Sequence, residues 1–201
     1  MLFILTGEVQ TGKTRWLESL AADLVERGVP VAGVLAPGQW VPSASEHADA
    51  NGYEKLGIDN LLLPGGELVP FTRRYDLARE DGTFDENSQA ARAELAWHIA
   101  DDAIDRVNAH FDGLAESAQR GGLLIVDELG RLELWKKGGL TSAMSLLLQG
   151  PTAAFPNALV VVRDYLLEDA EALLAPAWCE TARIAPLQAA RRLVIDTCMG
   201  A

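Results

Sequence analysis

Eight consecutive residues early in the chain have types and spacing that could bind phosphate. They fit the pattern G-x-x-x-x-G-K-[ST] at every fixed position, as Gly7, Glu8, Val9, Gln10, Thr11, Gly12, Lys13 and Thr14. In such a loop, backbone N–H groups and the positive end of the following helix surround phosphate oxygens. Lys13 would add a positive charge at the β- and γ-phosphates, and the Thr14 hydroxyl would be a ligand for Mg²⁺. We therefore expect a nucleoside triphosphate as substrate and Mg²⁺ as cofactor.

A second candidate site follows the apolar run at residues 123–126, which ends in Asp127 and Glu128. A buried strand would bring Asp127 to its carboxyl end, the edge where ligands bind in open α/β sheets. There Asp127 could hold Mg²⁺ through a water molecule, and Glu128 could orient or deprotonate an attacking water. Alone, an Asp-Glu pair after a strand is more often a solvated turn. The phosphate loop favours the functional interpretation.

Other side chains that could do chemistry carry weaker signals. Three arginines could form a lid that clamps phosphate, although nearby carboxylates offer them ion pairs instead: Arg73, Arg74 and Arg79, with Asp76, Glu80 and Asp81. The three histidines share no metal-ligand spacing. The five tryptophans are expected mainly in packing, with Trp40 able to cover a nucleotide base from its loop. In the phosphate loop, the Glu8 carboxylate must point outward or be paired, because it would otherwise repel phosphate.

The elements that would position these residues begin with a strand–loop–helix–strand unit. Leu2–Leu5 is a short apolar run, typical of a buried strand. Apolar residues then recur at helical spacing over residues 13–27, until Gly28 and Pro30 end the pattern. Val31–Leu35 forms a second apolar run. This order predicts the βαβ unit of a parallel sheet, with the phosphate loop between the first strand and the helix.

The next part of the chain has a different pattern. Turn residues interrupt short apolar runs at 53–58, 60–63 and 67–71, which predicts small antiparallel strands in an insert at about 51–72, beside the main sheet. Residues 41–50 are expected to form a loop. One long helix over about 86–118 is predicted from an apolar stripe, with a break near Asp112 and Gly113. The stripe consists of Leu95, Ile99, Ala103, Val107, Phe111 and Leu114.

The remainder again alternates strands with helices. Strands are predicted at 123–126, 159–162 and 179–184, and helices at 140–148, 165–174 and 187–199. The strand at 179–184 is the weaker one, and the others are apolar rather than alternating, so the pattern predicts a mostly parallel sheet covered by helices on both faces. The predicted fold class is α/β with a small antiparallel β insert, in a single domain spanning residues 1–201.

Composition limits the partners. The 201 residues carry 17 Lys and Arg against 29 Asp and Glu, a formal net charge of −12 without a basic run. That charge disfavours nucleic acid. The longest apolar runs are too short to cross a bilayer. Two cysteines without CxxC spacing, and no visible secretory signal, favour a reducing cytoplasm. Nothing in the sequence identifies a protein partner.

The segment from Asp127 to Leu134 reads DELGRLEL and resembles the D-E-[IL]-G-[KR]-[ML]-E-L Walker B signature of the THEP1-like nucleoside-triphosphatase family. The early phosphate loop (Walker A), the run VAGV at residues 31–34, the β insert and the run VVVR at residues 160–163 are similar too. The resemblance implies a P-loop NTPase fold with a RecA-like core. It also implies Mg²⁺-dependent hydrolysis of ATP, GTP and other nucleoside triphosphates to diphosphate and phosphate. In that core Arg163 would emerge beside the γ-phosphate, as a candidate for stabilising transition-state charge. A glycine is usual in the family at the position of Gln10.

Two other functions remain open. A nucleotide-gated regulatory or binding module would use the same loop with little turnover. A small-molecule kinase would need an acceptor pocket and an arginine lid, for which residues 73–79 are the only support. The chain lacks the N-K-x-D and T-K-x-D patterns that read guanine in regulatory GTPases, so strict GTP specificity by that route is disfavoured.

Overall fold

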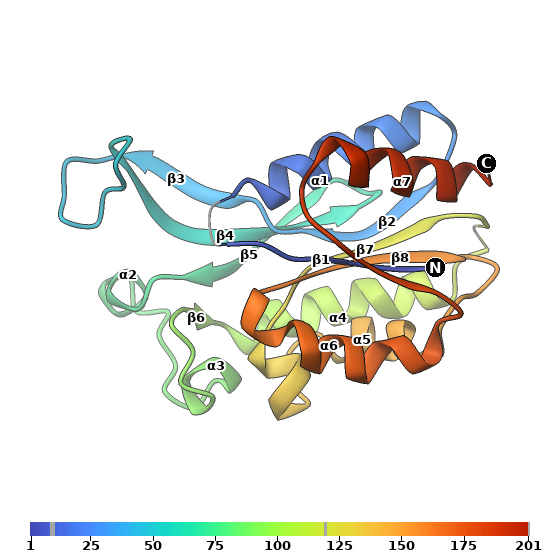
Figure 1. Cartoon of the computed structure of the whole chain (residues 1–201). Helices are drawn as coiled ribbons and strands as arrows, with labels where there is room; N and C mark the ends of the chain where they lie inside the picture. The colour runs from blue at the N-terminus through green and yellow to red at the C-terminus, as the bar shows by residue number, and fades with distance from the viewer. Residues whose placement is uncertain (9–10, 119, 201) are drawn as a thin grey trace.

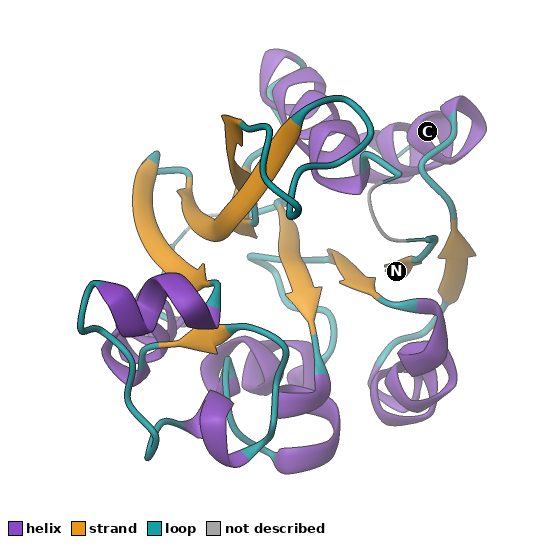
Figure 2. Cartoon of the chain, turned by 90° about the vertical axis from the view of Figure 1, so that its left-hand side faces the viewer, coloured by secondary structure: helices purple, strands orange, loops and turns teal. Residues whose placement is uncertain are grey.

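The computed structural model of the chain describes residues 1–8, 11–118 and 120–200, which form one twisted mixed sheet between two layers of helices (Figures 1 and 2). Five strands, β1 (Leu2–Leu5), β2 (Val31–Leu35), β7 (Leu123–Leu129), β8 (Asn157–Val162) and β9 (Thr181–Ile184), are mutually parallel in the order β2-β7-β8-β1-β9. These strands match the apolar runs of the sequence, and β8 lies between β1 and β7. Within the described residues, no helix is long and apolar enough to span a bilayer.

Alternating side chains of the parallel strands pack against opposite layers. Helices α1 (Lys13–Glu26) and α7 (Gln188–Met199) cover one face, where Phe3 and Leu5 are buried with Leu20. Helices α4 (Asp101–Ala115), α5 (Thr141–Gln149) and α6 (Leu167–Leu174) cover the other, where Leu2 and Ile4 are buried. Because both faces of β1, β2, β7 and β8 are buried, these four strands are apolar at nearly every position, whereas the edge strand β9 includes Thr181 and an exposed Arg183. The helices predicted at 13–27, 140–148 and 187–199 are confirmed within two residues. The one predicted at 165–174 begins as a 3₁₀ turn, η2 (Asp164–Leu166), before α6.

The antiparallel strands extend the same sheet instead of lying beside it. They are β3 (Gly38–Pro42), β4 (Tyr53–Leu63), β5 (Glu67–Arg73) and β6 (His98–Ile99). Strand β4 pairs with β2 through Leu61, Leu62 and Leu63, and then with β3 and β5. The predicted insert at 51–72 was therefore too short, and two of its predicted runs are one continuous strand. Residues 41–50 are not all loop, because β3 continues to Pro42.

The prediction of one helix over residues 86–118 is wrong. The chain instead forms α3 (Gln89–Arg92), β6 and α4, after a short helix α2 (Tyr75–Glu80). Ser88 caps α3 by accepting a hydrogen bond from the Ala91 N–H, and the helix ends before Glu94, whose φ is 51°. Ile99 continues the four-residue apolar spacing only by coincidence, because it pairs with Thr72 in the sheet. Within α4 the stripe is correct, and the helix runs through Asp112 and Gly113 without the expected break.

Candidate functional site

The phosphate loop connects β1 to α1 at the carboxyl edge of the parallel strands. Gly12 caps α1 with φ 81° and ψ 22°, a left-handed conformation that glycine adopts without strain. The Lys13 ammonium donates hydrogen bonds to the carbonyl oxygens of Gly7 and Glu8, each at 2.7 Å, and the Thr11 hydroxyl donates to the Glu8 carbonyl at 2.9 Å. Glu8 itself is exposed. Val9 and Gln10 lie outside the described residues.

Electrostatics leave the start of α1 open to an anion. The first turn of the helix contains no acidic residue, so no carboxylate side chain of that turn neutralises its positive end. The Lys13 ammonium is held back over the loop, on the side of the helix N-terminus. The positive end of the α1 dipole and the Lys13 ammonium thus lie together at the start of the helix, an arrangement that can bind an anion.

Asp127 lies within reach of the phosphate loop. Its carboxylate accepts hydrogen bonds from the Thr14 hydroxyl and from the Ala36 N–H, the latter at 3.1 Å. The side chain is buried, and burial raises its pKa to about 6, although those two hydrogen bonds and the Lys13 charge oppose the shift. A buried carboxylate with raised pKa is one whose negative charge is incompletely compensated.

Thr14 and Asp127 fit the requirements of Mg²⁺. The cation prefers hard oxygen ligands, usually from one or two side chains together with substrate phosphates and water. The hydroxyl of Thr14 and the carboxylate of Asp127 are adjacent, and the latter lacks full charge compensation. Among the described residues there is no cluster of three or more His, Cys, Asp or Glu that would form a larger metal cage. This donor set therefore suits a metal that arrives with a phosphate ligand.

Glu128 and Arg163 form an ion pair next to Asp127. The Arg163 Nε donates to Glu128 Oε1 at 2.7 Å, with both side chains partly exposed. The pair is possible because β7 and β8 are neighbours and the register between them shifts between Val126 and Leu129. Strand β7 thus continues past its predicted end, and the two acidic residues sit in the irregular part of the ladder. One residue further, Asp164 accepts a hydrogen bond from the Thr6 hydroxyl, which links this edge to the phosphate loop.

The segment after Glu128 is ordered by Glu133. Its carboxylate accepts hydrogen bonds from the Gly130 N–H at 2.8 Å and the Leu140 N–H at 3.0 Å, and burial raises its pKa. Arg131 donates to the Glu94 carbonyl at 2.8 Å. The π-helix η1 (Leu132–Lys136) lies between these contacts. Both residues therefore tie the segment to its neighbours.

The three candidate lid arginines are engaged elsewhere. Arg73 pairs with Asp81, and Arg74 pairs with both Glu54 and Asp76. The Arg79 guanidinium lies 4.8 Å from the centre of the Phe84 ring. The pairs with Asp81 and Asp76 are ion pairs that the sequence offered as the alternative to a lid, whereas the pair with Glu54 and the contact of Arg79 with Phe84 were not expected.

Lys55, on β4, is a residue that the sequence analysis missed. It is half-buried, and its ammonium interacts electrostatically with Glu128, Arg163 and Asp127. One feature of the sequence could have drawn attention to Lys55: it is the one lysine or arginine between Arg27 and Arg73.

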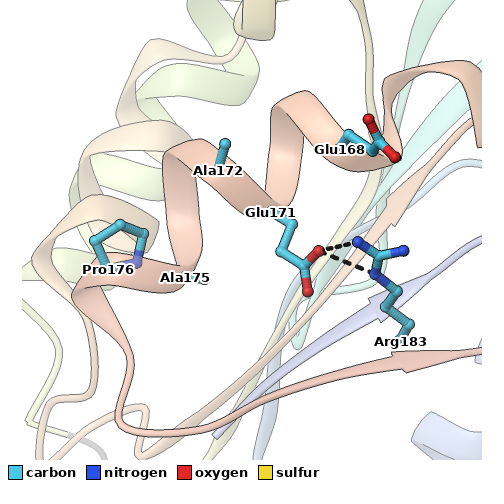
Figure 3. Close-up of a pocket in the computed structure, with 6 residues that line it drawn as sticks. All are labelled: Glu168, Glu171, Ala172, Ala175, Pro176 and Arg183. Atoms are coloured by element: carbon cyan, nitrogen blue, oxygen red, sulfur yellow. Dashed lines mark hydrogen bonds and ion pairs between the residues drawn. The ribbon is translucent and has the colours of Figure 1, made fainter.

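Two hollows lie apart from these residues. One, between α6 and β9, is lined by Glu168, Glu171 and Arg183 among others, with an ion pair between the last two (Figure 3). The other, about 310 Å³, lies between β5 and α4 and is lined in part by buried His98. Neither contains a residue of the phosphate loop, Asp127, Glu128 or Arg163.

The fold is a mixed α/β architecture that a solved nucleoside triphosphatase structure shares. The chain is similar to the solution structure of a human cancer-related nucleoside triphosphatase, with a TM-score of 0.55 and 16% sequence identity over 99% of this chain and 95% of that one. At that identity the likeness concerns the fold. No protein-family model and no curated protein sequence matches the chain.

Proposed function

We propose that this protein is a Mg²⁺-dependent nucleoside triphosphatase with a RecA-like P-loop core, of the THEP1-like kind that its Walker B segment resembles. The observation that carries the proposal is the meeting of two distant segments at one sheet edge. Lys13 and Thr14 come from the phosphate loop, and Thr14 is hydrogen-bonded to Asp127 at the end of β7. Triphosphate binding explains both the open helix N-terminus and the undercompensated carboxylate.

Each residue then has a defined role. The loop from Gly7 to Thr14 binds the β- and γ-phosphates through backbone N–H groups and the Lys13 ammonium. Thr14, and Asp127 through a water molecule, would hold Mg²⁺, which when bound would neutralise charge on the phosphate oxygens. Arg163 stabilises negative charge on the transferring phosphoryl group.

Glu128 is the proposed base for hydrolysis. A water oxygen attacks the γ-phosphorus while the bond from that phosphorus to the bridging oxygen breaks, which releases the nucleoside diphosphate. The water's proton goes to Glu128 and then to solvent. In this mechanism the proton goes to the carboxylate oxygen of Glu128 that does not accept the hydrogen bond from Arg163 Nε.

A second candidate is a nucleotide-gated module with little turnover. The same ion pair favours it, because Glu128 bound to Arg163 has one oxygen already occupied. The structure does not favour a kinase, because the three arginines that would form its phosphate-clamping lid contact other side chains. Multiple-turnover release of diphosphate, independent of any added small-molecule acceptor, would distinguish hydrolysis from both. A burst of one turnover would favour the gated module, and diphosphate release only with an acceptor would favour a kinase.

Metal removal provides a first prediction. Because Thr14 and Asp127 would hold Mg²⁺ beside the bound triphosphate, EDTA should lower the affinity for a non-hydrolysable triphosphate analogue at least about tenfold, or 1.4 kcal/mol. Calorimetry with and without Mg²⁺ measures the difference. Equal affinity in both conditions would contradict the metal assignment.

The partners proposed for the protein follow from the same chemistry. A nucleoside triphosphate is the substrate, and the net charge of −12 disfavours nucleic acid. A cytoplasmic location agrees with two free cysteines, Cys179 and Cys198.

A further inference from the structure

The first half of β4 projects past the edge where the phosphate loop lies. Strand β4 runs antiparallel to β2 and pairs with it from Leu61 to Leu63, so its earlier residues lie beyond Leu35, the carboxyl end of β2. Figure 1 shows β3 and this part of β4 extending beyond β1. The register shifts twice here, between Gln39 and Trp40 and between Ile58 and Asp59. Such bulges bend a strand and redirect its side chains.

Lys55 lies in this projecting half and interacts with the candidate site. The charges that act on its ammonium are those of Glu128, Arg163 and Asp127, which come from β7 and the end of β8. Burial lowers the pKa of Lys55, the two carboxylates oppose that shift and Arg163 adds to it. Within the part of the chain that the structure describes, no carboxylate lies within ion-pair distance of its Nζ. Lys55 is therefore a partly desolvated cation without a direct anionic partner.

Aromatic side chains hold this cation in position. Its Nζ lies 5.8 Å from the centre of the Trp40 ring and 5.6 Å from that of Trp97. Gly38 leaves the space for this arrangement, because a Cβ there would meet Trp40 Nε1 at 2.5 Å and Lys55 Cε at 3.1 Å. Cation–π contacts orient an ammonium while leaving its N–H groups free for another acceptor.

We propose that Lys55 is a further catalytic residue, which binds the γ-phosphate and stabilises its charge during transfer. The inference rests on the proposed function. Glu128 already accepts a hydrogen bond from Arg163, so Lys55 is not needed to pair with it. A phosphoryl group between Lys13, Arg163 and Lys55 would bring the anion that this cation lacks. Lys55 then adds a positive charge from the antiparallel part of the sheet.

The test compares Lys55→Met with Lys136→Met, which removes the same charge from an exposed position on η1. We expect Lys55→Met to lower kcat about 10²-fold, the size of effect seen when one transition-state donor is removed. Its affinity for Mg²⁺ and a triphosphate analogue should fall, whereas that for Mg²⁺ and ADP should stay within about threefold. Lys136→Met should match the wild type. Lys55→Arg, which keeps the charge, should recover part of the activity.

The outcomes separate the two claims. If the wild type hydrolyses triphosphate and Lys55→Met matches it, the role of Lys55 is wrong and the proposed function stands. The role would also be overturned if Lys55→Met lost affinity equally for ADP and for the triphosphate analogue. A Tm lowered in both Lys55→Met and Lys55→Arg, with no activity recovered by the arginine, would likewise indicate a structural role. A wild type that binds but releases no phosphate would overturn the proposed function, and the role of Lys55 with it.

Discussion

Glu128→Gln should lower kcat about 10²–10⁴-fold, the usual range for loss of general-base catalysis, while nucleotide affinity changes little. The amide keeps the size of the side chain but cannot take a proton from water. Affinity should hold because Glu128 is not proposed to touch phosphate, and removal of a nearby negative charge can tighten binding slightly. Single-turnover phosphate release and calorimetry with a triphosphate analogue measure the two effects separately.

The matched control is Glu168→Gln, which removes a carboxylate from the exposed side of α6. It should leave both kcat and affinity unchanged. Wild-type turnover in Glu128→Gln would remove Glu128 from the mechanism. A parallel loss of affinity and melting temperature would instead mean that its ion pair with Arg163 maintains the structure of this edge.

Gly33→Ala should destabilise the fold by about 3 kcal/mol, because it combines a backbone clash with conformational strain. Gly33 lies in β2 between β4 and β7, with φ 114°. A Cβ there would lie 1.9 Å from the carbonyl oxygen of Ile125, on the strand that carries Asp127. The backbone of a central strand cannot move aside without disturbing the ladders on both sides.

Gly66→Ala is the control that separates strain from clash. Gly66 also has positive φ, 75°, but a Cβ there meets no heavy atom within 4 Å. Strain alone should cost about 1 kcal/mol. Urea denaturation of the two variants measures the difference, and equal midpoints would contradict the account of close packing between β2 and β7.

The parallel core was predictable because its strands are short continuous apolar runs bounded by turn residues. The strands Leu2–Leu5 and Val31–Leu35 were predicted with the correct ends. Burial on both faces makes such a strand a continuous apolar run, which begins and ends clearly in the sequence. The error at residues 86–118 has a physical cause. Four-residue spacing through Leu95 and Ile99 imitates a helix, but the pairing of Ile99 with Thr72 is a tertiary contact that no local pattern contains.

The candidate site was predictable to the extent that its residues follow strands. Asp127 and Lys13 belong to local motifs, and the parallel order of the strands brings those motifs to one edge. Lys55 belongs to no motif. Its position involves register shifts where β4 pairs with β3 and with β5, and the packing of Trp40 and Trp97, which sequence spacing does not specify.

Steady-state phosphate release from ATP, GTP, CTP and UTP, with Mg²⁺, tests the central claim most directly. We expect continuous release over many turnovers by the wild type and loss of release in Lys13→Ala, whose nucleotide affinity should fall because its ammonium contacts phosphate in the ground state and the transition state alike. Thermal melting would confirm that the variant is folded. Tight binding of triphosphate by the wild type without release of phosphate from any of the four, or release that persists in a folded Lys13→Ala, would contradict the account.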